Sequence, residues 1–168
     1  MSTNHEPAAL QPVAFSSLAD LQQAVGQRVG ASGWITVTQP LIDAFAELTN
    51  DRQWIHVDPE RARRESPLGT TIAHGFLTLS LLSSMTAQCV RFPNARAGFN
   101  YGFDRVRFVS PVPVNAQIRG VFTIDAVRPI DGGADITWGV AVEVRDARKP
   151  AVIATWLTRT LFRDIAAG

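Results

Sequence analysis

The sequence has few of the residues that build disulfides or metal sites. It contains a single cysteine, Cys89, and three histidines, His5, His56 and His74. A lone cysteine excludes an internal disulfide framework, and the spacing of the histidines matches no common metal-ligand pattern. We therefore expect a protein of a reducing compartment that holds no metal and no cofactor.

The chain also lacks an excess of charge of either sign. Its 16 lysine and arginine residues face 15 aspartate and glutamate residues, which leaves a net charge of +1. So small a charge creates no field that would draw the protein to nucleic acid or to a membrane surface. An anionic ligand would have to be held by a local group of basic side chains.

The N-terminus lacks the pattern of an export signal. His5 and Glu6 stand where a signal would need a basic start followed by an apolar core. We expect a cytoplasmic protein whose residues 1–14 form a flexible tail. Because the chain is long enough for one well-buried core, residues 15–168 are predicted to form a single domain.

A stretch without formal charge runs over residues 70–90 and is long enough to span a bilayer. Its many serine and threonine residues, together with His74 and Gln88, would make a poor lipid-facing surface. A helix enclosed by protein can satisfy such groups, and this one has apolar residues on nearly every side. We therefore predict a long central helix and no membrane insertion.

The rest of the chain predicts short helices followed by a strand meander. A short helix is expected after Ser16 and up to Gly26, a strand at 34–38, a helix ending near Asn50, and another beginning at Asp58-Pro59. Long strand-like runs follow, at 99–109, 116–128, 134–145 and 151–162. This order predicts an α+β fold in which a curved antiparallel sheet wraps around the central helix.

Asp51 and His56 are the most promising chemical pair. On one continuous helix, residues five apart point about 140° from each other. On an irregular link between two helices, the two side chains can converge, and a carboxylate beside an imidazole can transfer protons near neutral pH. Spacing alone leaves a plainer alternative open, in which Asp51 caps a helix and His56 is a loop residue.

The segment NDRQWIHVDP, residues 50–59, resembles the hydratase motif of the MaoC-like dehydratases, usually Gly-Asp-x-Asn-Pro-(Leu/Ile)-His-x-Asp-Pro. Aspartate, histidine and the Asp-Pro helix start are in register. The resemblance implies that Asp51 and His56 are the catalytic acid/base pair. Asn50, Gln53 and Trp54 depart from the motif and put the shape of the substrate in doubt.

A second segment, IAHGF at residues 72–76, is similar to the family's opening of the central helix. The resemblance implies that the backbone N–H of Gly75 binds the thioester carbonyl, and a helix start does favour developing negative charge. The family's helical serine, near the acid/base pair, falls on Ser83. A serine bonded back to its own helix is the alternative for Ser83, and His74 is interpreted as structural.

A third segment, residues 100–112, resembles the family's Tyr-Gly-x-x-(Lys/Arg)-Val-Arg-Phe-x-x-Pro-Val strand, so the likeness covers residues 45–112. Within the family, Trp54 and the tripeptide His74-Gly75-Phe76 are most similar to the sequences of the NodN-like branch. We predict that Trp54 forms part of the acyl-tunnel wall, with burial in the core or against a partner as the alternative.

The resemblance implies a hotdog fold and an (R)-specific enoyl-CoA hydratase, or 3-hydroxyacyl-CoA dehydratase, that acts on a CoA or acyl-carrier-protein thioester. A homodimer is the expected assembly. The alternatives are an acyl-thioester-binding hotdog protein without catalysis and an acyl-CoA thioesterase. The sequence leaves open the acyl chain, the carrier, the pathway, which of the pair is the base, and which arginines bind phosphate among Arg61, Arg63, Arg64, Arg96, Arg105 and Arg107.

Overall fold

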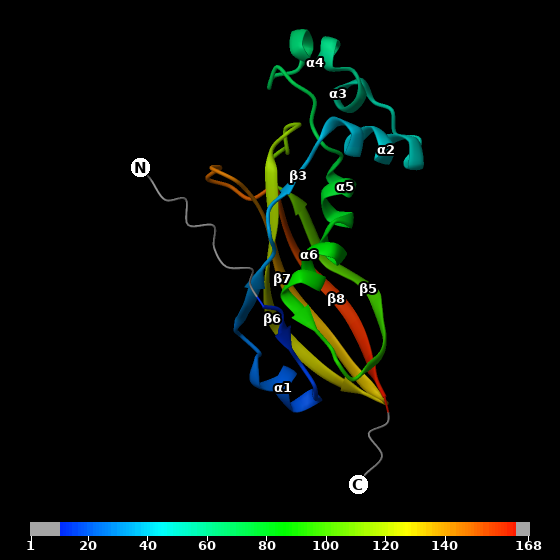
Figure 1. Ribbon diagram of the computed structural model, residues 1–168, viewed down its shortest axis with the longest axis vertical. Coiled ribbons are helices and arrows are strands. Elements are labelled where there is room, and N and C mark those ends of the chain that lie inside the picture. The colour runs from blue at the N-terminus through cyan, green and yellow to red at the C-terminus, as the bar shows by residue number, and fades with distance from the viewer. Residues whose placement is uncertain (1–10, 164–168) are drawn as a thin grey trace.

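A curved antiparallel sheet dominates the computed structural model, which describes residues 11–163 (Figure 1). The last four runs of the chain form long strands that pair in the spatial order β6, β7, β8, β5. Two short strands from the N-terminal part pair with β6 and extend the sheet on that side. The strands are β2 (Arg28–Ala31), β3 (Ile35–Thr36), β5 (Ala95–Phe108), β6 (Gln117–Ile130), β7 (Gly133–Val144) and β8 (Val152–Phe162).

Strand β7 shows how one face of the sheet builds the core. Along it buried and partly buried residues alternate as far as Glu143, because successive side chains point to opposite faces. The buried set faces the helices and includes Ile136, Trp138 and Val142, each at most 1% exposed. The strand predicted at 134–145 is confirmed.

The central helix runs along this buried face in two consecutive pieces, α5 (Gly75–Ser80) and α6 (Leu82–Cys89). The backbone remains bonded across the junction, because Leu81 N–H donates to Leu77 O and Met85 N–H donates to Leu81 O, at 3.2 and 3.0 Å. The single long helix expected from the sequence is thus divided at Leu81. A sheet wrapped around this helix is the hotdog fold, as expected.

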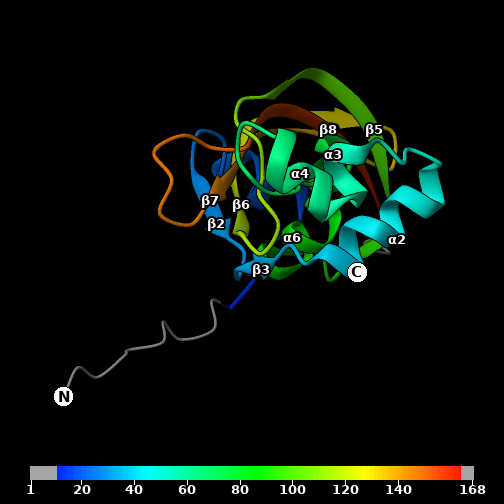
Figure 2. The ribbon, with the colours of Figure 1, turned by 90° about the horizontal axis from the view of Figure 1, so that it is seen from above.

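The remaining helices gather mostly at one end of the sheet. Helices α2 (Gln39–Thr49), α3 (Trp54–Val57) and α4 (Pro59–Glu65) cover the end where α5 begins, whereas α1 (Leu18–Gln23) lies at the other end (Figures 1 and 2). Asp58 caps α4 as predicted, by accepting from Arg61 N–H at 2.9 Å. No helix in the described part of the chain is long and apolar enough to cross a membrane.

The predicted N-terminal tail is too long. Strand β1 (Val13–Ala14) pairs in parallel with β4 (Val90–Arg91), and Phe15 N–H donates to Arg91 O at 2.9 Å. These contacts make Val13 and Ala14 part of the fold. The other ends of the two predicted ranges, residues 1–10 and 164–168, lie outside the described residues.

Strand β5 forms an edge of the sheet and carries a row of exposed apolar side chains. Phe99, Tyr101, Phe103 and Phe108, together with Val109 directly after the strand, are each between 38% and 58% exposed. An open strand edge with such a row invites pairing with another chain. We therefore keep the prediction of a homodimer and propose that its two copies associate through this edge.

The molecular mass in solution tests the predicted dimer directly. Light scattering at micromolar concentration should give twice the chain mass of 18.3 kDa. A charge placed in the row, Phe99→Asp, should lower the measured mass because a buried carboxylate at a strand edge is costly. A wild-type mass of one chain would contradict the prediction.

Candidate active site

The link between α2 and α3 carries the candidate pair. Helix α2 ends at Asn50, whose φ of 57° lies in the left-handed region and turns the chain sharply. Asparagine is one of the few residues apart from glycine that tolerates this conformation, which explains how it replaces the family's usual glycine. Asp51 directly follows Asn50. His56 comes five residues after Asp51 and lies in α3.

The structure brings Asp51 and His56 together. A carboxylate oxygen of Asp51 and one ring nitrogen each of His56 and His74 all lie within 4.8 Å of one another. His56 is 7% exposed, and the N-cap of α3 is Gln53. The alternative of Asp51 as a cap and His56 as a loop residue is therefore wrong, because His56 belongs to α3, and the two side chains converge as the irregular link predicts.

The hydrogen bonding of His56 fixes which nitrogen is free for chemistry. Its Nδ1 lies 2.7 Å from Ile72 O, and since a carbonyl only accepts, Nδ1 carries the hydrogen. Nε2 of the neutral ring then holds a lone pair. Burial lowers the pKa of His56 below 6.5, and His74 lowers it further. The bond to Ile72 O and the nearby Asp51 raise the pKa, but they do not outweigh the burial. His56 is thus held neutral near pH 7.

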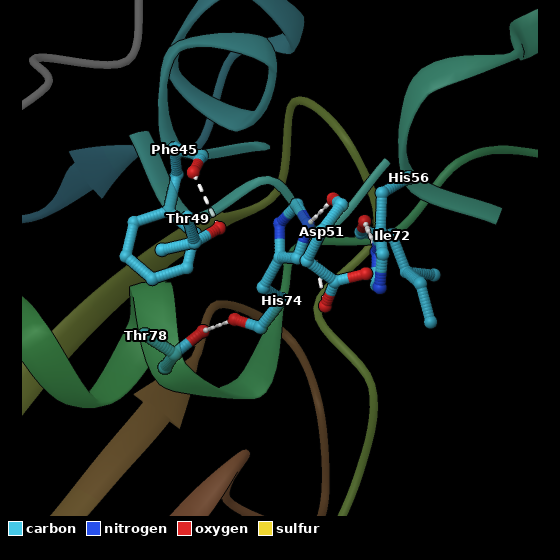
Figure 3. A network of polar contacts seen from close by, with 7 residues as sticks. All are labelled: Phe45, Thr49, Asp51, His56, Ile72, His74 and Thr78. Carbon is cyan, nitrogen blue, oxygen red and sulfur yellow. Dashed lines mark hydrogen bonds and ion pairs between the residues drawn. The ribbon is translucent and has the colours of Figure 1, made fainter. Parts of the chain in front are cut away.

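His74 touches both members of the pair. Its Nε2 donates to the main-chain oxygen of Asp51 at 2.8 Å, and its ring stacks on His56 with centroids 3.8 Å apart. The ring lies between those of His56 and Phe45 (Figure 3). The sequence interpretation of His74 as structural missed this placement, because nothing in the spacing of residues 51, 56 and 74 predicts a stack.

A cavity of about 430 Å³ opens beside His56. Gly75, the first residue of α5, lies in its wall, and a Cβ at this position would meet the Phe108 ring at 2.9 Å. The N–H of the first helical residue is not used by helical bonding and is available to an oxygen in the cavity. Apart from His56 the lining is apolar or neutral: Ile72, Ala73, Gly75, Phe76, Thr78, Phe108, Val109, Ser110, Pro111, Val112, Ala151 and Val152.

Ser83 is not brought to the pair. It is exposed on α6 and lines two other hollows between this helix and strands β5 and β8, of about 250 and 450 Å³. The helical hydroxyl in the wall of the cavity is that of Thr78, which is buried and directed at His74 O at 3.4 Å. Helical spacing of four from His74 could have indicated Thr78.

Trp54 also lies outside the described lining of this cavity. It is half-buried, and the Arg61 guanidinium covers its ring at 4.5 Å from the centroid. The structure thus places Trp54 away from the predicted tunnel wall, beside α4.

Trp54→Ala should therefore leave the ratio of crotonyl-CoA to dodecenoyl-CoA hydration rates unchanged. It should lower the melting temperature, because a stacked, half-buried ring is lost. Both quantities can be measured on one preparation. A changed rate ratio would show that Trp54 contacts the acyl chain, as the tunnel-wall prediction states.

None of the six candidate arginines is among the described residues that line the cavity. Two of them, on α4, are engaged in ion pairs, Arg61 with Glu65 at 2.7 Å and Arg63 with Glu60 at 2.6 Å. The structure assigns no individual arginine to a phosphate.

The three clustered residues are better arranged to hold a water molecule than a metal ion. One nitrogen of each imidazole is already bonded to a main-chain carbonyl. The His74 nitrogen that lies 3.9 Å from the Asp51 carboxylate, Nε2, carries the hydrogen bonded to the Asp51 main-chain oxygen, so it has no lone pair for a metal ion.

Comparison with known proteins places the chain in a family. The family model described as "MaoC like domain" matches residues 20–145. Nodulation protein N of Rhizobium leguminosarum bv. viciae is 48% identical over 145 residues, 84% of this chain and 89% of that protein. The 3-hydroxyacyl-thioester dehydratase Z of Mycobacterium tuberculosis (strain H37Rv) is 44% identical over 146 residues, 86% of this chain and 96% of that protein.

A solved structure agrees with the fold. The unliganded R-hydratase PhaJ1 from Pseudomonas aeruginosa superposes with a TM-score of 0.67 at 21% identity, covering 87% of this chain and 86% of that chain. The extent of the family match and the identity of the relatives show that this chain belongs to the MaoC-like family.

Proposed function

We propose that the protein is a hydro-lyase that reversibly adds water to a trans-2-enoyl thioester and gives the (R)-3-hydroxyacyl thioester. The observation that carries the proposal is that the Asp51 carboxylate lies within 4.8 Å of a ring nitrogen of His56, and that His56 lines the same cavity as Gly75. A relative named for 3-hydroxyacyl-thioester dehydration, at 44% identity over nearly its whole length, supports it.

In this proposal a water molecule sits between the Asp51 carboxylate and His56 Nε2. His56, neutral and with its lone pair on Nε2, takes one proton as the water oxygen bonds to C3 of the enoyl group. The C2–C3 double-bond electrons move toward the thioester carbonyl, whose oxygen is stabilised by Gly75 N–H. The imidazolium then returns the proton to C2. Asp51 orients the water and stabilises the transient positive charge on His56.

The acyl chain would extend from the cavity along the central helix. The hollows of about 250 and 450 Å³ follow α5 and α6 in order and lie, like the cavity, against β5 and β8. Ser83 lies where the two hollows meet, so its predicted contact would be with the acyl chain and not with the reacting atoms. The thioester's carrier, CoA or acyl-carrier protein, would stay outside.

Crotonyl-CoA tests the proposal against both alternatives. Enoyl absorbance should fall while a thiol reagent detects no free CoA. Release of free thiol at the rate of substrate loss would indicate a thioesterase. Binding without either signal, measured by calorimetry, would indicate a non-catalytic acyl-thioester-binding protein.

The acidic limb of the pH–rate profile should have its midpoint below 6.5. Burial disfavours the charged form of His56, so its pKa is lowered and the neutral base survives to lower pH than a free imidazole would. For the same reason stability should be intact above pH 6.5 and fall as the pH drops below it, where the unfolded chain binds the proton first. A limb in kcat/KM at or above 6.5 would contradict this assignment of the base.

A further inference from the structure

We infer that His74 is a positioning residue, which holds Asp51 by its main-chain carbonyl and packs face to face on His56. The inference rests on the proposed function, because positioning matters only if the pair reacts. The ring joins three elements: it belongs to the start of α5, it binds the link after α2, and it stacks on α3.

The bond to Asp51 is an anchor for an otherwise loosely held residue. The Asp51 side chain is 55% exposed, and its Oδ2 lies 3.9 Å from His74 Nε2, beyond hydrogen-bond distance. The main-chain bond of 2.8 Å comes from a ring that is 3% exposed and also packed on Phe45, with centroids 5.2 Å apart. A fixed ring therefore sets the position of the Asp51 main chain, from which the carboxylate extends.

The same bond decides which ring nitrogen of His74 carries the hydrogen. Because the carbonyl of Asp51 accepts, Nε2 carries the hydrogen, and the lone pair is on Nδ1. Nδ1 is buried and has no hydrogen-bond partner among the described residues.

The stack then couples His74 to His56. At 3.8 Å between centroids, His74 disfavours a positive charge on His56 and so lowers the pKa of His56. Few other charges act on them. Asp43 is bonded to Gln39, Glu47 pairs with Arg52, Asp58 caps α4, and the described cavity lining holds no titratable group besides His56. Asp51 is the charged side chain within 4.8 Å of both rings.

Two variants separate the anchor from the stack. His74→Phe keeps a buried aromatic ring against His56 and Phe45 but loses the bond to Asp51, so kcat should fall roughly 10- to 100-fold, as expected for a misplaced catalytic group. His74→Gln keeps an N–H donor for the Asp51 carbonyl but loses the stack, so kcat should fall less. In both, the acidic limb should move upward, because His74, which lowers the pKa of His56, is no longer present.

An NMR titration of the His56 ring keeps the test independent of turnover. The His56 pKa should be higher in either variant than in the wild type, even if the wild type hydrates no enoyl thioester and the proposed function fails. If one variant does not fold, the other carries the same comparison. An unchanged His56 pKa together with an unchanged acidic limb would reduce His74 to a packing residue, and a fully active His74→Phe would overturn the anchor.

Discussion

Asp51→Asn and His56→Ala should each lower the hydration rate by at least about 100-fold, the usual contribution of a general acid or base. Asparagine keeps the size of the Asp51 side chain but not its negative charge, so the imidazolium formed during the reaction loses its counter-charge. Alanine at position 56 removes Nε2, the proton acceptor for the attacking water.

Circular dichroism and melting temperature should show that both variants remain folded. Glu47→Gln is the matched control, because it makes the same carboxylate-to-amide change on α2 at an exposed residue paired with Arg52. The control should keep the wild-type rate. If either site variant retained near-full activity on a substrate that the wild type hydrates, the pair would be wrongly assigned.

Gly75→Ala should lower kcat/KM by roughly 10- to 100-fold, the scale on which small displacements of reacting groups act. The new Cβ would lie 2.9 Å from the Phe108 ring, which is closer than real contacts allow. Either the ring moves into the cavity or the start of α5 moves away from the thioester carbonyl. The N–H itself remains, so the loss would report its position.

The double variant Gly75→Ala, Phe108→Leu tests whether the clash with the Phe108 ring causes the loss of activity. A smaller side chain at position 108 relieves the contact, so the double variant should be more active than the product of the two single effects predicts. Strict additivity would mean that the clash with Phe108 is not the cause. Full activity of Gly75→Ala would show that the carbonyl binds elsewhere.

The sequence predicts those parts of the fold in which local pattern and burial agree. Alternation along residues 134–144 predicts β7 because a sheet with one buried face requires period two. Asp58-Pro59 predicts the start of α4 because an acceptor at the N-cap and a proline at the first helical position both fit a helix end. Asp51 and His56 converge as their motif predicts.

Local pattern does not determine how side chains are placed relative to the cavity or how distant segments meet. Trp54 and His56 are two residues apart on α3, so they point about 160° apart around the helix, and Trp54 does not line the cavity beside His56. Ser83 lies eight residues after Gly75, which places it about 12 Å further along the helix axis. The pairing of Val13–Ala14 with β4 and the stack of His74 on His56 join distant segments, which no local signal records.

The most direct measurement follows the water oxygen. Crotonyl-CoA incubated with the protein in water labelled with heavy oxygen should give (R)-3-hydroxybutyryl-CoA with one labelled oxygen at C3 and an intact thioester, by mass spectrometry and chiral chromatography. Asp51→Asn should form this product at least about 100-fold more slowly. Labelled free crotonate, or unchanged crotonyl-CoA and unchanged longer enoyl thioesters, would contradict a hydratase built on Asp51, His56 and Gly75.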